Sequence, residues 1–109
     1  MSTLQNEIPI WLRLWMQQAL IGAVYPSLRG VAVGYYDDRS VTIRYYIDRP
    51  PSDFDHEVID ILCSEVLSNT SSNAELPALR TEVIFSEDIQ SELPPLSGFV
   101  FKRMEGDYL

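Results

Sequence analysis

An alternation of apolar and polar side chains at residues 41–48 constrains the fold more than any other feature of the chain. Successive side chains of an extended strand point to opposite faces, so this segment would present one apolar and one polar face. The apolar members are Val41, Ile43, Tyr45 and Ile47, and the polar face carries Thr42, Arg44, Tyr46 and Asp48. Residues 28–36 form a second strand-like run, and residues 37–40 join the two as a polar turn. We therefore predict a β-hairpin over residues 28–48.

The first strand of this hairpin has one face that is almost bare. Gly30, Ala32 and Gly34 alternate with Val31 and Val33. A strand face with so few side-chain atoms allows another element to approach its backbone closely. We expect the N-terminal helix to pack there.

That helix is indicated by the most hydrophobic stretch of the chain. Pro9 suits the first turn of a helix, apolar residues then continue at helical spacing to Ala23, and Pro26 should end the helix. Apolar side chains cover nearly the whole circumference and leave a narrow polar notch at Arg13 and Gln17, so this helix needs cover on two sides. The stretch is too short and too often interrupted to span a bilayer, which takes about 20 predominantly apolar residues.

A second helix is expected after the proline pair at residues 50–51. Ser52 offers a hydroxyl cap, and the carboxylates of Asp53 and Asp55 lie near the positive end of the helix dipole. We expect the helix to run to about Leu67. The side chains predicted for its apolar face are Phe54, Val58, Ile61, Leu62 and Val66. Those predicted for an opposing stripe that faces water are Asp53, Glu57, Asp60 and Ser64.

Two further strand-like runs occupy residues 79–85 and 98–103. The polar connector at residues 68–73 is too short to separate domains, so we treat residues 1–109 as a single domain. The order helix, strand, strand, helix, strand, strand (α-β-β-α-β-β) indicates an α+β fold with two layers. We expect a mostly antiparallel four-stranded sheet with both helices on one face, and with the other face partly open.

The chain contains one cysteine, Cys63, and one histidine, His56. A single cysteine forms no intramolecular disulfide, and this pair alone supplies too few ligands for a cysteine and histidine metal cluster. The N-terminus carries Glu7 where a secretory signal peptide needs Lys or Arg. We therefore expect a cytoplasmic protein without a membrane segment.

The net charge of −8 is unevenly distributed along the chain. Residues 1–49 hold five arginines and four acids, whereas residues 50–101 hold ten acids and only Arg80. Such acidity repels phosphates, which argues against direct binding of nucleic acid, and attracts a cationic protein surface. High solubility alone would also explain it. We expect a basic protein partner.

The residues give little support for catalysis. Cys63 and His56 are seven positions apart on the expected second helix, about 10 Å along its axis, which is too far to share a proton. The acid pairs at residues 37–38 and 87–88 could hold Mg²⁺, but adjacent acids are ordinary turn residues because aspartate caps its own backbone. Glycine-rich phosphate loops and Gly-x-Ser-x-Gly elbows are absent from the sequence. We expect neither catalytic residues nor a cofactor nor a metal.

Several short segments carry a family resemblance. Residues 24–33 (VYPSLRGVAV), 43–48 (IRYYID), 51–55 (PSDFD) and 98–103 (GFVFKR) resemble small immunity proteins of bacterial contact-dependent growth inhibition. The resemblance implies a cytoplasmic protein that binds the C-terminal toxin domain of a cognate effector, often a nuclease acting on RNA, and blocks its active site. It requires no chemistry of the immunity protein itself.

Because the resemblance does not define the binding surface, we predict that surface from charge. The favoured set combines the acidic stripe of the second helix with the acids of the long loop at residues 86–97, provided that the fold brings them together. These residues are Asp53, Glu57, Asp60, Glu87, Asp88 and Glu92, with Asp37 and Asp38 at the hairpin tip as a second choice. Two alternatives remain. One is a homodimeric structural or regulatory subunit that associates through Trp11 and Trp15, and the other is an enzyme that uses an acid pair with Mg²⁺.

Overall fold

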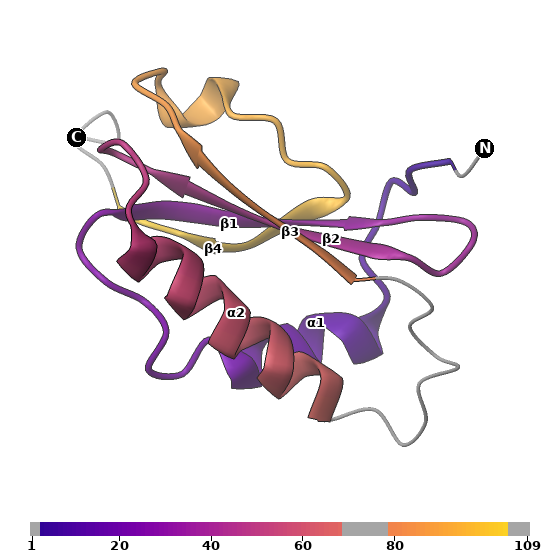
Figure 1. Cartoon of the computed structure of the whole chain (residues 1–109). Coiled ribbons are helices and arrows are strands. Elements are labelled where there is room, and N and C mark those ends of the chain that lie inside the picture. Colours follow the sequence, from indigo (N-terminus) through magenta and orange to yellow (C-terminus); the bar gives the residue numbers. More distant parts are fainter. Residues whose placement is uncertain (1–2, 69–78, 105–109) are drawn as a thin grey trace.

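The computed structural model describes residues 3–68 and 79–104 of the chain. A four-stranded sheet in the order β3-β2-β1-β4 forms one layer, and two helices cover one of its faces (Figure 1). The elements in chain order are α1 (Ile10–Ala19), β1 (Leu28–Tyr35), β2 (Val41–Ile47), α2 (Asp53–Ser68), β3 (Leu79–Phe85), the 3-10 helix η2 (Gln90–Glu92) and β4 (Gly98–Lys102). The prediction of an α+β fold with both helices on one face is confirmed.

The predicted hairpin is confirmed. β1 and β2 are antiparallel, and Tyr35 pairs with Val41 next to the turn. The turn is closed by a hydrogen bond from the Tyr36 amide to the Ser40 carbonyl, at 3.0 Å, and Arg39 adopts a positive φ of 71°. Local alternation was sufficient to predict this part of the fold.

The sheet is mixed, so the prediction of a mostly antiparallel sheet is wrong. β3 runs parallel to β2, with Val41 beside Leu79 and Ile47 beside Phe85. The physical reason is α2, because a helix that crosses beneath the sheet after β2 returns the chain to the end at which β2 began. The element order also differs slightly, since η2 lies between β3 and β4.

The first helix is shorter than predicted. α1 ends at Ala19, and Gly22 then adopts a φ of 82°, so the chain leaves the helix before Pro26. α1 buries Leu12, Met16 and Ala19 against the core. Its opposite side is not covered within the described residues.

The predicted apolar face of the second helix is partly wrong. Phe54 and Ile61 are exposed, whereas the buried side chains of α2 are Asp55, Ile59, Leu62 and Val66. The helix is rotated relative to the prediction because Asp55 has polar partners inside the fold. The stripe that holds Asp53, Glu57, Asp60 and Ser64 is exposed, as predicted.

Apolar side chains pack on both faces of the sheet. The larger core lies between the sheet and the helices, and Leu12, Val33, Ile43 and Tyr45 are among its fully buried members. A smaller core lies on the opposite face, which we call the loop face, under the segment between β3 and β4 (Figure 1). Its members are Ala32, Tyr46 and Leu93, with Ile84, Leu96 and Phe99 packed against them. The loop face is therefore only partly open.

The bare face of β1 belongs to this smaller core, so the expectation that the N-terminal helix packs there is wrong. A Cβ atom on Gly30 would lie 3.1 Å from the Phe99 ring, and one on Gly34 would lie 3.3 Å from Leu4. Phe99 of β4 fills the space beside Gly30, and Leu4 of the N-terminal segment and Leu96 of the loop fill the space beside Gly34.

Candidate partner-binding surface

The orientation of α2 depends on a buried carboxylate at its first turn. Asp55 accepts hydrogen bonds from Arg49 Nη1 and Nη2 at 2.7 and 3.0 Å, and from the Tyr25 hydroxyl at 2.7 Å. The Ser52 amide and hydroxyl also donate to it, at 2.8 and 3.0 Å, whereas a capping serine was expected to accept a bond from the helix. The Asp55 side chain has no solvent exposure, while that of Arg49 is 37% exposed. Asp55 therefore ties α2 to the segments that precede β1 and follow β2.

These contacts keep Asp55 ionised. Burial by itself would raise the pKa of Asp55, but the hydrogen bonds from Arg49, Tyr25 and Ser52 outweigh it and hold that pKa below its usual range. Burial and the bond to Asp55 raise the pKa of the Tyr25 hydroxyl. A charged group at this position is structural, and it determines which side of α2 faces water.

The exposed side of α2 combines carboxylates with apolar side chains. A shallow hollow along it is lined by Asp53, His56, Glu57, Asp60, Ile61 and Ser64. Phe54 and Ile61 are 51% and 55% exposed, and the Phe54 ring packs edge-on against Tyr25 with centroids 5.1 Å apart. Interface anchors are commonly aromatic or aliphatic side chains surrounded by charged groups. We call these residues, Phe54 included, the α2 outer face.

Exposed apolar side chains gather in the helical layer. Ten large apolar side chains of the described residues are exposed, and six of them lie on α1, the turn that follows it, and α2. These six are Ile10, Leu14, Ile21, Val24, Phe54 and Ile61. Phe54 and Ile61 were predicted to lie in the core, because the local pattern does not show that Asp55 is buried and its partner Tyr25 lies 30 residues away along the chain.

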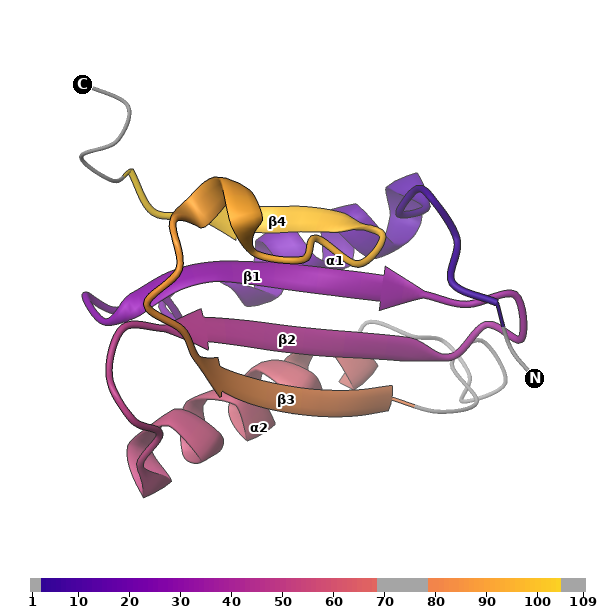
Figure 2. The same cartoon turned by 90° about the horizontal axis from the view of Figure 1, so that it is seen from above.

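The structure does not bring the two predicted acidic groups together. Asp53, Glu57 and Asp60 lie on α2, beneath the sheet, whereas Glu87, Asp88 and Glu92 lie on the loop that crosses the loop face (Figure 1). Figure 2 shows the same separation from above, with η2 over β1 and β4 and α2 under β3. All six side chains are exposed. A compact partner site therefore cannot include both groups side by side.

The second-choice acids at the hairpin tip both accept hydrogen bonds, Asp37 from the N-terminal segment and Asp38 from its own turn. Asp37 accepts a bond from the Thr3 amide at 2.8 Å. Asp38 accepts bonds from the Ser40 hydroxyl and amide at 2.6 and 3.0 Å, and these bonds lower the pKa of Asp38. The interpretation as a turn residue that caps its own backbone is confirmed for Asp38, whereas Asp37 caps the N-terminal segment.

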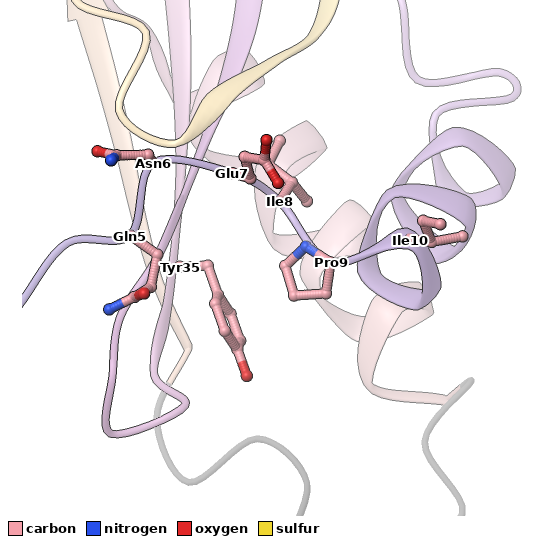
Figure 3. Close-up of a pocket in the computed structure, with 7 residues that line it drawn as sticks. All are labelled: Gln5, Asn6, Glu7, Ile8, Pro9, Ile10 and Tyr35. Carbon is pink, nitrogen blue, oxygen red and sulfur yellow. The ribbon is translucent and has the colours of Figure 1, made fainter.

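The described residues contain no arrangement that favours catalysis. Burial, together with the charge of Asp60, raises the pKa of the Cys63 thiol and makes it a poor nucleophile. In residues 3–68 and 79–104, no three His, Cys, Asp or Glu side chains gather in a way that could hold a metal ion. Figure 3 shows another hollow, between the N-terminal segment and α1, in which the ring of Tyr35 lies beside Pro9. Its lining is Gln5, Asn6, Glu7, Ile8, Pro9, Ile10 and Tyr35, which offers no nucleophile paired with a base.

The tryptophans proposed for a helix 1 dimer are engaged within the chain. Trp11 and Trp15 pack edge-on with centroids 4.7 Å apart, and both are half-buried against the helix-side core. Trp11 also meets the ring of Tyr35 at 6.0 Å. The more exposed side chains of this helix are Ile10 and Leu14, at 78% and 58%. No helix in the described stretches is long and apolar enough to cross a membrane.

Comparison with protein families identifies the kind of protein. A family model described as MafI2 immunity protein matches residues 9–105, which includes every helix and strand of the structure. No curated protein matches the chain.

Proposed function

Because the chain belongs to the MafI2 immunity protein family, we propose that it neutralises a cognate toxin by binding it through the α2 outer face. The observation that carries this proposal is the arrangement on one helix of exposed carboxylates beside exposed Phe54 and Ile61. The family provides the kind of partner, a toxin, and the surface chemistry supports where that toxin binds.

The charge of the chain supports a basic toxin, and among basic toxins a nuclease. A site that holds nucleic acid phosphates must be electropositive, so an acidic surface is able to occupy it or bind beside it. Asp53, Glu57 and Asp60 are exposed on α2, and the whole chain has a net charge of −8. Opposite charges also accelerate encounter between the two proteins. We therefore propose a nuclease as the partner. The further proposals that it acts on RNA and that it is delivered in contact-dependent growth inhibition rest on the sequence resemblance of segments such as residues 24–33 and 43–48.

The apolar members of the α2 outer face would provide much of the binding energy. Complete burial of a phenylalanine or isoleucine side chain contributes about 1.5–3 kcal/mol, and Phe54 and Ile61 are each about half exposed in the free protein. Phe54 is also held in place by Tyr25, which limits the entropy lost on binding. Protection from a toxin requires little free toxin, so we expect nanomolar affinity or better, roughly −12 kcal/mol or beyond.

This role places the protein in the cytoplasm and requires no catalysis by it. The proposal is supported by the half-buried Cys63 thiol and by the hydrogen bonds that engage Asp37 and Asp38, three of the groups first considered for catalysis. Inhibition would come from occupation of toxin surface alone.

Co-expression tests the proposal. The gene is expressed with the toxin domain encoded next to it, and cell survival and copurification are measured. We expect survival and a complex that dissociates more readily at high salt. Death of the cells despite soluble, folded protein would contradict the immunity role for that toxin.

A matched pair of variants tests the surface. Glu57→Lys with Asp60→Lys should weaken the complex at least tenfold, mainly through a slower association rate. Glu87→Lys with Asp88→Lys makes the same change of net charge on the loop face and serves as the control. Equal weakening by both pairs would show that only net charge matters, and weakening by the control alone would move the site to the loop.

A further inference from the structure

The sheet has two edges, and they differ in how much of the described chain covers them. β4 is short, a bulge interrupts its pairing with β1, and Arg13 donates a hydrogen bond to its Phe99 carbonyl at 3.3 Å. β3 has seven residues in regular register with β2, and β2 is its only neighbour among the described strands. A regular edge strand without such protection is a template for pairing with another chain.

The side chains of β3 divide into a polar and an apolar set. Arg80 and Glu82 pair with β2 residues of the loop face, whereas Leu79 and Val83 pack against the helix-side core. Arg80 is exposed, and the Glu82 side chain is 42% exposed. Both groups are accessible at the edge.

Glu82 has capacity for a second cationic partner. Arg44 donates to Glu82 through Nε at 3.0 Å and approaches it through Nη2 at 2.9 Å, and both contacts are with Oε1. The structure gives Oε2 no partner among the described residues. A shallow hollow lined by Tyr36, Thr42, Arg44, Arg80, Thr81 and Glu82 runs beside this carboxylate.

The sequence of β3 is complementary to itself in one antiparallel register. With Thr81 opposite Thr81 of a second copy, Arg80 lies opposite the other Glu82, and Leu79 lies opposite the other Val83, each pair occurring twice. A shift of two residues in either direction, the smallest that keeps each side chain on the same face of the sheet, would place Arg80 opposite Arg80, or Glu82 opposite Glu82. Opposite charges directly across a strand pair stabilise it and like charges destabilise it, so the first register is strongly selected.

We propose that two copies of this chain associate through β3 and so form a continuous eight-stranded sheet with Thr81 at the two-fold axis. The occupant of the edge is a second copy because the charges and the apolar side chains of β3 complement themselves in one register. The hollow beside Glu82 is lined by two arginines, Arg44 and Arg80, and by one glutamate, although the whole chain has a net charge of −8. Two acidic molecules that associate at β3 would therefore meet where their electrostatic repulsion is least. The association is isologous and closes at the dimer.

Sedimentation velocity over a concentration series tests the proposal, with toxin absent. The unmodified chain should approach twice 12.5 kDa as concentration rises. Arg80→Glu places two acidic pairs across the axis and should raise the dissociation constant roughly tenfold or more. Arg39→Glu makes the same change of net charge at the hairpin turn and should leave the dissociation constant within about twofold of the unmodified value.

Mixing of variants gives the decisive result. Arg80→Glu and Glu82→Arg should each be monomeric alone, yet a mixture of the two should form a heterodimer, because every cross-strand pair is then opposite in charge. The double variant R80E/E82R should dimerise by itself. Hydrogen exchange of the β3 amides in the unmodified chain should also slow as concentration rises, a measurement that needs no variant.

Three results would overturn the proposal. They are a monomer at every concentration with β3 exchange unchanged, a dimer that Arg80→Glu does not weaken, and a dimer that is lost in Leu14→Ser. The last result would assign association to the exposed side of α1.

Discussion

Replacement of the buried carboxylate at the start of α2 should be the most destabilising polar substitution in the described chain. Asp55→Ala removes the acceptor of five hydrogen bonds, which come from Arg49, Tyr25 and Ser52. Removing one member of a buried ion pair costs about 3–5 kcal/mol. Arg49 is 37% exposed and can turn towards water, so we expect the lower end, about 3 kcal/mol.

Urea unfolding followed by tryptophan fluorescence measures this loss, because Trp11 and Trp15 pack against the core. A loss of about 3 kcal/mol would lower the urea midpoint by roughly 1–2 M, given a slope of about 2 kcal/mol/M. Arg49→Ala serves as the second corner of a double-mutant cycle. If the pair is coupled, Asp55→Ala with Arg49→Ala should cost less than the two single changes added together.

The dependence of folding stability on pH provides an independent measurement of the Asp55 contribution. The pKa of Asp55 is lower in the folded chain than in the unfolded chain, so its contribution is complete above the unfolded pKa, about 3.9, and is lost as pH falls below it. Asp55→Ala should therefore flatten the dependence of stability on pH below about pH 4. Additive single changes, or an unchanged pH dependence, would refute our account of how this carboxylate positions α2.

Three further substitutions or measurements test the packing. Tyr45→Phe should leave stability unchanged or raise it by up to about 1 kcal/mol, since the Tyr45 hydroxyl is buried without a hydrogen-bond partner among the described residues. A clear loss of stability in urea unfolding would reveal a partner for this hydroxyl. Gly30→Ala should cost about 1–2 kcal/mol in the same assay, because the new methyl group would lie 3.1 Å from the Phe99 ring and 3.3 Å from the Phe101 carbonyl. Cys63 should react with a thiol reagent more slowly than a free cysteine at neutral pH, because burial and Asp60 raise the pKa of its thiol. The rate of this reaction should increase as pH rises. Fast reaction at pH 7 would show a more accessible thiol.

Local patterns predicted those parts of the fold that depend on neighbouring residues. The hairpin follows from alternation in one segment and from turn residues at 37–40, and both strands formed as predicted. The start of α2 was predicted in the same way, since a proline pair and Ser52 act within one turn. The parallel pairing of β3 with β2 was missed because it depends on where α2 returns the chain, which no local pattern contains.

The candidate site was predicted less well, for a comparable reason. The acidic stripe of α2 was correctly placed on the outside, but Phe54 and Ile61 were assigned to the core. The difference comes from Asp55, whose partners Tyr25 and Arg49 come from other segments. A carboxylate at the third position after a helix cap is already explained by its favourable interaction with the helix dipole. The sequence therefore offered no reason to expect that the Asp55 side chain is buried.

The sheet order has a consequence for the time at which the protein becomes protective. β1 lies between β2 and β4, yet β1 ends at Tyr35 and its second neighbour begins only at Gly98. During synthesis both edges of β1 can therefore be paired only after residues 98–102 have left the ribosome. At elongation rates of about 5–20 residues per second this delay is on the order of several seconds. A nascent chain is thus still incomplete after the residues of the proposed toxin-binding helix have all been made.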